Sequence, residues 1–96
     1  MANNDFTAAA EKHLNLLKQY TPVLAKVHGQ SHPELSEVRD LVKSLTGKIK
    51  NNDRDLQTEF TRLKEITGNY EVPADGCETY EAVYSMLREL DEAYIG

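Results

Sequence analysis

Residues 6–27, FTAAAEKHLNLLKQYTPVLAKV, set the class of the fold. Apolar side chains recur here every three or four residues, the spacing that places them on one face of an α-helix. The predicted apolar face consists of Phe6, Ala9, Ala10, His13, Leu14, Leu17, Tyr20, Leu24 and Val27. Pro22 lacks the amide hydrogen that would bond to the carbonyl of Lys18, so we expect a kink or a short break near Tyr20 and Thr21.

A second helix is predicted to begin shortly after the first one ends. Ser31 and Glu34 have the spacing of a capping box, and Pro33 suits the first position of a helix. Gly29, just before them, is expected to end the first helix in a left-handed turn. The apolar positions of the second helix are Leu35, Val38, Leu41, Val42, Leu45 and Ile49.

A third apolar series follows the polar residues 51–53 and ends at Gly68, which suits a left-handed helix end. Its members are Leu56, Phe60, Leu63 and Ile66. Two whole turns separate Ile49 from Leu56, so one continuous helix across 51–53 is an alternative. Such a rod would be about 50 Å long, twice the diameter of about 25 Å expected for a compact chain of this size. We therefore predict a turn at 51–53 and a helical hairpin.

A fourth helix is predicted from Cys77 to about Ala93, with Asp75 and Glu78 spaced as a cap and its reciprocal partner. Its apolar face consists of Cys77, Tyr80, Val83, Tyr84, Leu87, Leu90 and Tyr94. No alternating apolar and polar run is long enough to indicate a sheet. The sequence therefore predicts an all-α, up-down-up-down four-helix bundle with short loops, in which residues 1–96 form a single domain.

The composition agrees with one small domain and excludes several partners. Of the 96 residues, 40% are hydrophobic and 28% are charged, and the net charge is −5. A chain of this length buries roughly 60–65% of its unfolded surface, enough for one core but not for two. Acidic and basic residues alternate without a basic block, so binding of nucleic acid is not expected.

The apolar runs are too short to cross a membrane, and the first residues do not resemble a signal peptide. We therefore expect a cytoplasmic protein that does not bind membranes. The single cysteine, Cys77, has no intrachain partner for a disulfide, which agrees with a reducing compartment.

The sequence contains no common catalytic motif, so we predict that the chain is not an enzyme. Cys77 is interpreted as a small buried core residue, with a reactive thiol at a helix amino end as the alternative. His13, on the apolar face of the first helix, is interpreted as a hydrogen-bonded core histidine. His28 and His32, together with Glu34, are the candidate ligands of a single metal ion.

Acidic residues are interpreted as solvated helix faces, because they lack the order of a calcium loop. This group contains Glu37, Asp40, Asp53, Asp55, Glu59, Glu89 and Glu92.

Two segments carry a family resemblance. Residues 26–35, KVHGQSHPEL, and residues 63–70, LKEITGNY, are followed by Pro73, Cys77, Thr79, Tyr80 and Tyr84. Together they resemble the hemerythrin-like domain of the Repair of Iron Centres (RIC) family, di-iron four-helix bundles that are associated with restoring damaged iron–sulfur clusters. The resemblance implies the same all-α fold and a role in stress response.

Most of the family's iron ligands have no counterpart in this chain. A gapless match places Thr7 where the first helix of the family carries a histidine. The second helix stops before the family's His-Met-x-Lys-Glu-Glu segment, residues 52–54 lack the histidine that opens the third helix, and the closing histidine would fall beyond Gly96. Only His28 matches a position of iron ligation. The resemblance therefore implies a shortened homologue without a di-iron cofactor, whose only candidate metal ligand is His28.

Three functions follow from these observations. The first is an accessory or interaction protein in iron–sulfur cluster repair that acts by binding a protein partner. The second is a homodimer or helical adaptor unrelated to iron, whose acidic exterior and tyrosines form the contact surface. Of these tyrosines, Tyr80 and Tyr84 are assigned to the core, and Tyr70 and Tyr94 are left open. The third is a weak mononuclear metal binder.

Overall fold

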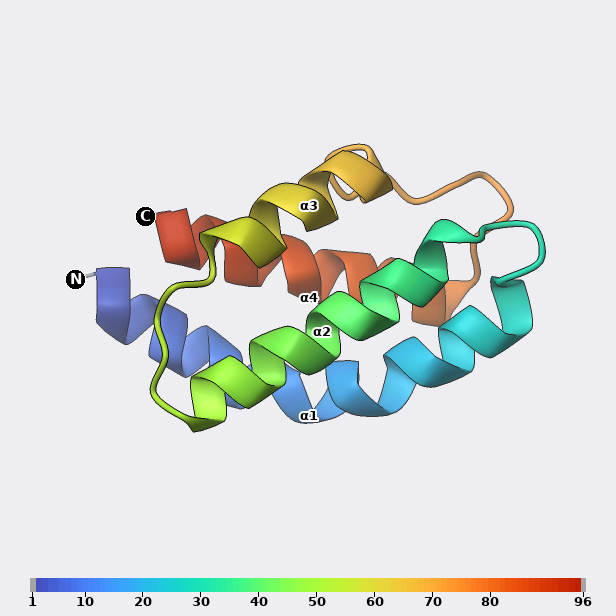
Figure 1. The fold of residues 1–96 in the computed structure, drawn as a ribbon. Coiled ribbons are helices and arrows are strands. Elements are labelled where there is room, and N and C mark those ends of the chain that lie inside the picture. The colour runs from blue at the N-terminus through green and yellow to red at the C-terminus, as the bar shows by residue number, and fades with distance from the viewer. Residues whose placement is uncertain (1, 96) are drawn as a thin grey trace.

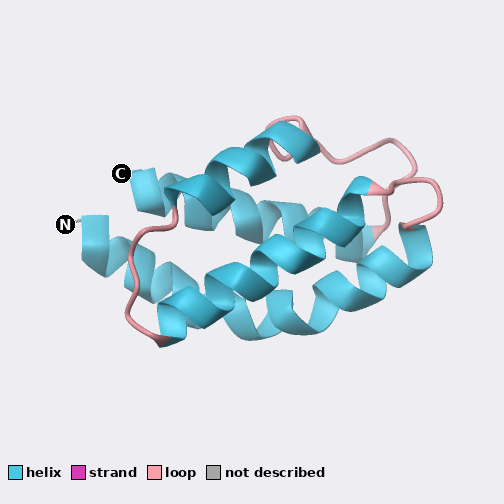
Figure 2. Ribbon diagram, viewed as in Figure 1, coloured by secondary structure: helices cyan, strands magenta, loops and turns pink. Residues whose placement is uncertain are grey.

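A computed structural model describes residues 2–95, with the side chains of residues 6–94. It contains four helices, α1 (Ala2–His28), α2 (Glu34–Lys50), α3 (Gln57–Thr67) and α4 (Glu78–Ile95). Successive helices run in opposite directions, and the two ends of the chain lie at the same end of the molecule (Figure 1). No strand occurs in the described part of the chain (Figure 2). The predicted all-α, up-down-up-down four-helix bundle is confirmed.

Helix α1 continues through Pro22 without the predicted break. Figure 1 shows that its axis nevertheless changes direction partway along, so the helix bends around the bundle. The hydroxyl of Thr21 donates a hydrogen bond to the carbonyl oxygen of Leu17 at 2.9 Å, within the turn that precedes the proline. A side-chain bond of this kind, next to a missing amide, is a usual companion of helix bending.

The inner face of α1 differs from the predicted apolar face in its second half. Tyr20 and Val27 were expected in the core, but they are exposed. Thr21 is buried in their place because its hydroxyl is satisfied within the helix, so burying it leaves no polar group without a partner. Ala25 is also buried.

The connection between α1 and α2 is built differently from the prediction. Gly29 does not have a positive φ; instead, a Cβ atom there would lie 2.2 Å from the carbonyl oxygen of Ala25. The predicted capping box of Ser31 and Glu34 does not form, because α2 begins after Pro33 without a side-chain cap. The amide of Leu35 bonds instead to a loop carbonyl, that of His32.

The hairpin between α2 and α3 is confirmed, and the continuous rod is excluded. The chain leaves α2 at Lys50, and Asn52 takes a left-handed conformation with φ of 58°. The longest dimension of the bundle is 38 Å. Tyr94 of α4 fixes the loop, because its hydroxyl donates to the carbonyl oxygen of Arg54 at 2.9 Å and accepts the amide hydrogen of Leu56 at 3.1 Å.

The other helix ends are partly as predicted. Gly68 ends α3 in the predicted left-handed conformation, with φ of 60°. Helix α4 begins at Glu78, one residue later than expected. The carboxylate of Asp75 bonds to His32 and not to the first amides of α4, so its predicted capping role is wrong.

One apolar core joins the four helices. Helix α1 packs against both α2 and α4, and α3 packs mainly against α2. Tyr80 and Tyr84 are core residues, as predicted, and Tyr70 is buried as well. Helix α3 reaches α4 through aromatic side chains, since the rings of Phe60 and Tyr94 lie 5.2 Å apart. The largest fully buried side chains are Tyr80, Tyr84, Leu17, Leu35, Leu45, Leu56, Leu63, Leu87, Leu90, Val38, Val42 and Val83.

Two glycine-to-alanine variants should have opposite effects on stability. At Gly47, within α2, an added Cβ meets no atom within 4 Å, so Gly47→Ala should raise the free energy of unfolding by about 1 kcal/mol. Gly29→Ala forces a backbone clash and should lower it by roughly 1–3 kcal/mol. Urea unfolding followed by circular dichroism measures both; a stable Gly29→Ala variant would contradict the described turn.

Candidate functional site

Two of the three histidines lie against Tyr80 at one end of the bundle: His28, the last residue of α1, and His32, in the following loop. The Nε2 atom of His28 lies 3.4 Å from the Sγ atom of Cys77. The rings of His28 and His32 both meet the ring of Tyr80 edge-on, at centroid distances of 5.4 and 5.6 Å. Cys77 is exposed, so its interpretation as a buried core residue is wrong. It lies immediately before the first residue of α4, as the alternative interpretation proposed.

His32 is held by acidic residues. Its Nε2 atom lies 3.0 Å from both carboxylate oxygens of Asp75, and its Nδ1 atom lies 3.5 Å from Oε2 of Glu34. The hydrogen bond with His32 lowers the pKa of Asp75 below its ordinary value. These bonds tie the loop after α1 to the loop before α4.

The three candidate metal ligands do not converge on one point. The structure pairs His32 with Glu34, whereas His28 faces Cys77. Within residues 2–95, no group of three or more histidine, cysteine, aspartate or glutamate side chains has the arrangement of a metal site. A metal-binding role of His28 stays a prediction from the sequence.

His13 is a buried residue paired with Glu89 across α1 and α4, which confirms its interpretation as a bonded core histidine. Glu59 was interpreted as solvated, but only 6% of it is exposed. Its Oε2 atom accepts hydrogen bonds from Ser44 and Lys48 of α2, each at 2.9 Å. Burial alone raises the pKa of Glu59, but the bonds from Lys48 and Ser44 outweigh burial, so the pKa lies below its ordinary value.

Asp91 of α4 is a second buried carboxylate that the sequence did not reveal, at 2% exposed. It accepts a hydrogen bond of 2.6 Å from the hydroxyl of Tyr70. Burial and this bond raise the pKa of Tyr70 above its ordinary value. The two buried acids therefore fix α3 and its following loop to α2 and α4, which is a structural role.

A groove between α1 and α2 is the clearest candidate binding site. It consists of two adjoining hollows of about 640 and 420 Å³, which share Lys18, Thr46 and Lys50. Ligand pockets commonly fall in the same range of volume. We call it the α1–α2 groove; its apolar lining residues are Ala10, Leu14, Pro22, Val42, Gly47 and Ile49.

The charge of the α1–α2 groove is opposite to that of the whole chain. Its lining has only two acidic residues, Glu11 and Asp40, although the chain has a net charge of −5. The five basic residues of the lining are Lys18, Arg39, Lys43, Lys50 and Arg54. A local excess of positive charge beside apolar surface is the pattern expected of a site for an anionic, partly apolar partner.

Among the side chains of residues 6–94, four of these five basic residues have no acidic partner. Arg39 bonds to Asp40 at 3.3 Å, and Arg54 donates to the hydroxyl oxygen of Thr7 at 3.3 Å. In contrast, the described ion pairs, which cover the side chains of residues 6–94, include none for the three lysines of the groove, Lys18, Lys43 and Lys50.

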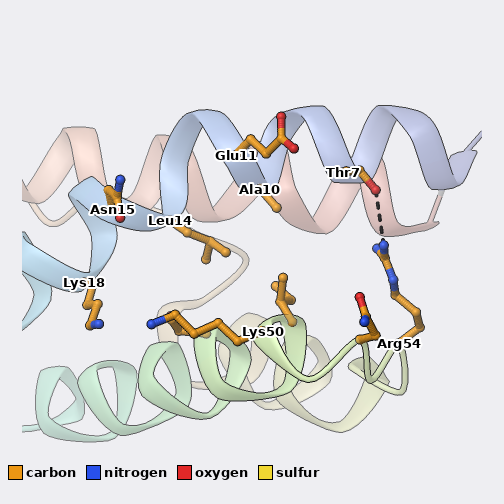
Figure 3. A pocket seen from close by; sticks show the side chains of 11 residues that line it. Thr7, Ala10, Glu11, Leu14, Asn15, Lys18, Lys50 and Arg54 are labelled. Atoms are coloured by element: carbon orange, nitrogen blue, oxygen red, sulfur yellow. Dashed lines mark hydrogen bonds between the residues drawn. The ribbon is translucent and has the colours of Figure 1, made fainter.

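Figure 3 shows the ammonium ends of Lys18 and Lys50 pointing toward one another from opposite walls of the groove. Two like charges that face each other repel, and a carboxylate placed between them would remove the repulsion. The centre of the groove is therefore electrostatically suited to a negative group.

A second surface lies on another side of α1. Four large apolar side chains are exposed there, with fractions that reach 55% for Val23 and 68% for Val27. The residues of this α1 stripe are Leu16, Tyr20, Val23 and Val27. They are separated by four, three and four residues, so they lie along one line on the helix surface.

Comparisons of the chain with family models, with curated proteins and with solved structures find no match. None of the helices within residues 2–95 combines the length and the apolarity needed to span a membrane.

The buried carboxylate of Glu59 should make stability depend on pH. Glu59→Gln should lower the free energy of unfolding at pH 7 by roughly 1–3 kcal/mol, because charge-assisted bonds from Lys48 and Ser44 are lost. A lowered pKa means that this stabilisation is present at neutral pH and disappears as the pH falls from the ordinary glutamate value through the lowered one.

Urea unfolding between pH 7 and pH 2.5 measures this effect, with Glu81→Gln at an exposed position as the control. The difference between wild type and Glu59→Gln should shrink as the solution becomes acidic. A difference that stays constant with pH would contradict the described bonding of Glu59.

Proposed function

We propose that this chain is a binding module that takes up an acidic segment of a partner protein in the α1–α2 groove. The single observation that carries the proposal is the excess of basic residues in an apolar-floored groove of a chain with net charge −5. A partner that complements such a site must bring carboxylates together with apolar side chains.

The two parts of the groove contribute differently to binding. Burial of apolar floor residues such as Leu14, Pro22 and Ile49 supplies most of the affinity, at about 25 cal/mol per Å². Exposed ion pairs contribute only about 0.2–1 kcal/mol each, but they select an acidic partner and speed its association. Salt should therefore weaken the binding moderately without abolishing it.

Both this function and the first function inferred from the sequence consist of binding a protein partner. The specific role in iron–sulfur cluster repair rests on the resemblance of residues 26–35 and 63–70 to the RIC family alone. That role would specify the identity of the partner protein. The binding function proposed for the α1–α2 groove does not depend on that role.

Reversal of charge in the groove tests the proposal. The probe is a displayed library of random peptides, selected on the immobilised full chain. Acidic peptides with apolar residues should be enriched, and Lys43→Glu/Lys50→Glu should weaken their binding by about tenfold or more, since two favourable ion pairs become repulsive. Fluorescence anisotropy in low and physiological salt measures the affinities.

The matched control is Lys12→Glu/Lys26→Glu, which makes the same charge change at two exposed positions of α1 outside the groove. This control should keep binding within about threefold of wild type. Equal losses in both variants would show that net charge, and not the groove, governs binding. Absence of acidic peptides from the selected pool, or equal binding of duplex DNA, would also contradict the proposal.

The α1 stripe supports a second function, self-association. The spacing of Leu16, Tyr20, Val23 and Val27 repeats as in the seam of a two-stranded coiled coil, so a second copy presents a surface of the same spacing. The sequence also led to a homodimer, but with a contact surface of acidic residues and tyrosines. The α1 stripe is a different, apolar surface for the same kind of assembly.

Solution mass tests self-association directly. Light scattering at high protein concentration should give twice 10.9 kDa for the wild type and 10.9 kDa for Val23→Glu, because a buried glutamate opposes the seam. Lys26→Glu, a neighbouring exposed substitution, should leave the dimer intact. A wild-type monomer at every concentration would rule out the α1 stripe as a dimer interface.

A further inference from the structure

The basic residues of one wall of the groove lie at helical spacing. Arg39, Lys43 and Lys50 all belong to α2 and are separated by four and seven residues. Both separations are close to whole numbers of helical turns, so the three side chains lie on one face of α2. Along the helix axis they are about 6 and 10.5 Å apart. The wall therefore presents a ladder of positive charge over about three turns.

The spacing of these three basic residues favours a helical bound segment over an extended one. An α-helix laid alongside α2 has the same rise per residue, so carboxylates four and seven residues apart meet Arg39, Lys43 and Lys50 from a single face. An extended segment rises about 3.3 Å per residue and would need carboxylates two and then three residues apart. Since side chains of an extended chain alternate between two faces, the third carboxylate would point away from the groove.

Gly47 provides an independent observation in the same place. It lies between Lys43 and Lys50 on the lined face of α2, and a Cβ atom there would meet nothing within 4 Å. Glycine inside a helix costs stability relative to alanine, and no described contact of this chain uses the missing side chain. The absence of a side chain lets the backbone of a second helix approach closely, as small residues do at helix–helix contacts.

Lys18 adds a charge from the opposite wall. Its ammonium end points toward that of Lys50 across the groove (Figure 3). A single carboxylate on the bound helix, opposite Lys50, therefore faces positive charge from both α1 and α2. This is the position at which the partner's acid is held most firmly.

We infer that the segment bound in the α1–α2 groove is an amphipathic α-helix that carries carboxylates four and seven residues apart beside a small apolar contact at Gly47. The inference rests on the proposed function, because it names the kind of acidic segment that the groove takes up. Arg39, Lys43 and Lys50 pair with the three carboxylates, and the apolar residues between them cover the exposed Pro22.

The test uses two synthetic peptides of identical composition. In the first, glutamates lie at positions 3, 7 and 14 with leucine and alanine on the same face; in the second, the glutamates have extended spacing, at positions 3, 5 and 8. A third peptide repeats the first with a central proline. Fluorescence anisotropy measures their binding to the full chain, and circular dichroism measures the helix content gained.

The first peptide should bind at least tenfold more tightly than the other two and should gain helix on binding. Gly47→Gln should weaken its binding at least tenfold, while Gly47→Ala should change it less than threefold. Glutamine is a better helix former than glycine, so a melting curve will show that the Gly47→Gln chain is folded.

Two results would overturn the inference. If all three peptides bind alike and Lys43→Glu/Lys50→Glu abolishes their binding, an acidic segment binds in another conformation and the proposed function survives. If Gly47→Gln binds the first peptide as the wild type does, no helix lies close to α2. Failure of the proposed function itself is a separate outcome, seen when the peptide library yields no acidic binder.

Discussion

The packing of α1 against both α2 and α4 is the constraint on which the rest of the structure depends. A helix of 27 residues has more surface than two neighbours can cover, and the bend in its axis curves it around the bundle. Leu17 and Leu24 take the inner side, whereas the sides that carry Lys18 and Val23 are left to solvent. The α1–α2 groove and the α1 stripe are both consequences of this arrangement.

The α1–α2 groove carries like charges on both of its walls. Lys18 and Lys50 point toward one another from opposite helices and have no acidic partner among the described residues. Gly47 has no side chain that could help to fill the space between them. In contrast, the buried Glu59 is paired, because its Oε2 atom receives hydrogen bonds from Ser44 and Lys48 of α2. The lysines of the groove are therefore left available to a partner, whereas the pair of Glu59 and Lys48 serves the fold.

Periodicity in the sequence was sufficient for the four helices, their order, the hairpin and the left-handed end at Gly68. Periodicity did not predict the burial of side chains that depend on a local hydrogen bond. Thr21 is buried because its hydroxyl bonds to the carbonyl of Leu17, whereas Tyr20 is exposed. The spacing of Arg39, Lys43 and Lys50 is visible in the sequence. Its role is not visible, because only the fold places Lys18 on the opposite wall and shows that the lysines have no acidic partner among the side chains of residues 6–94.

The most direct measurement is a titration of the ¹⁵N-labelled chain with an acidic amphipathic helical peptide, followed by amide chemical shifts. Binding of the peptide in the α1–α2 groove predicts that shifts concentrate along its walls, at Lys18, Lys43, Gly47 and Lys50, and that they shrink when salt is raised. Shifts confined to α3 and α4, or to the α1 stripe, would contradict it.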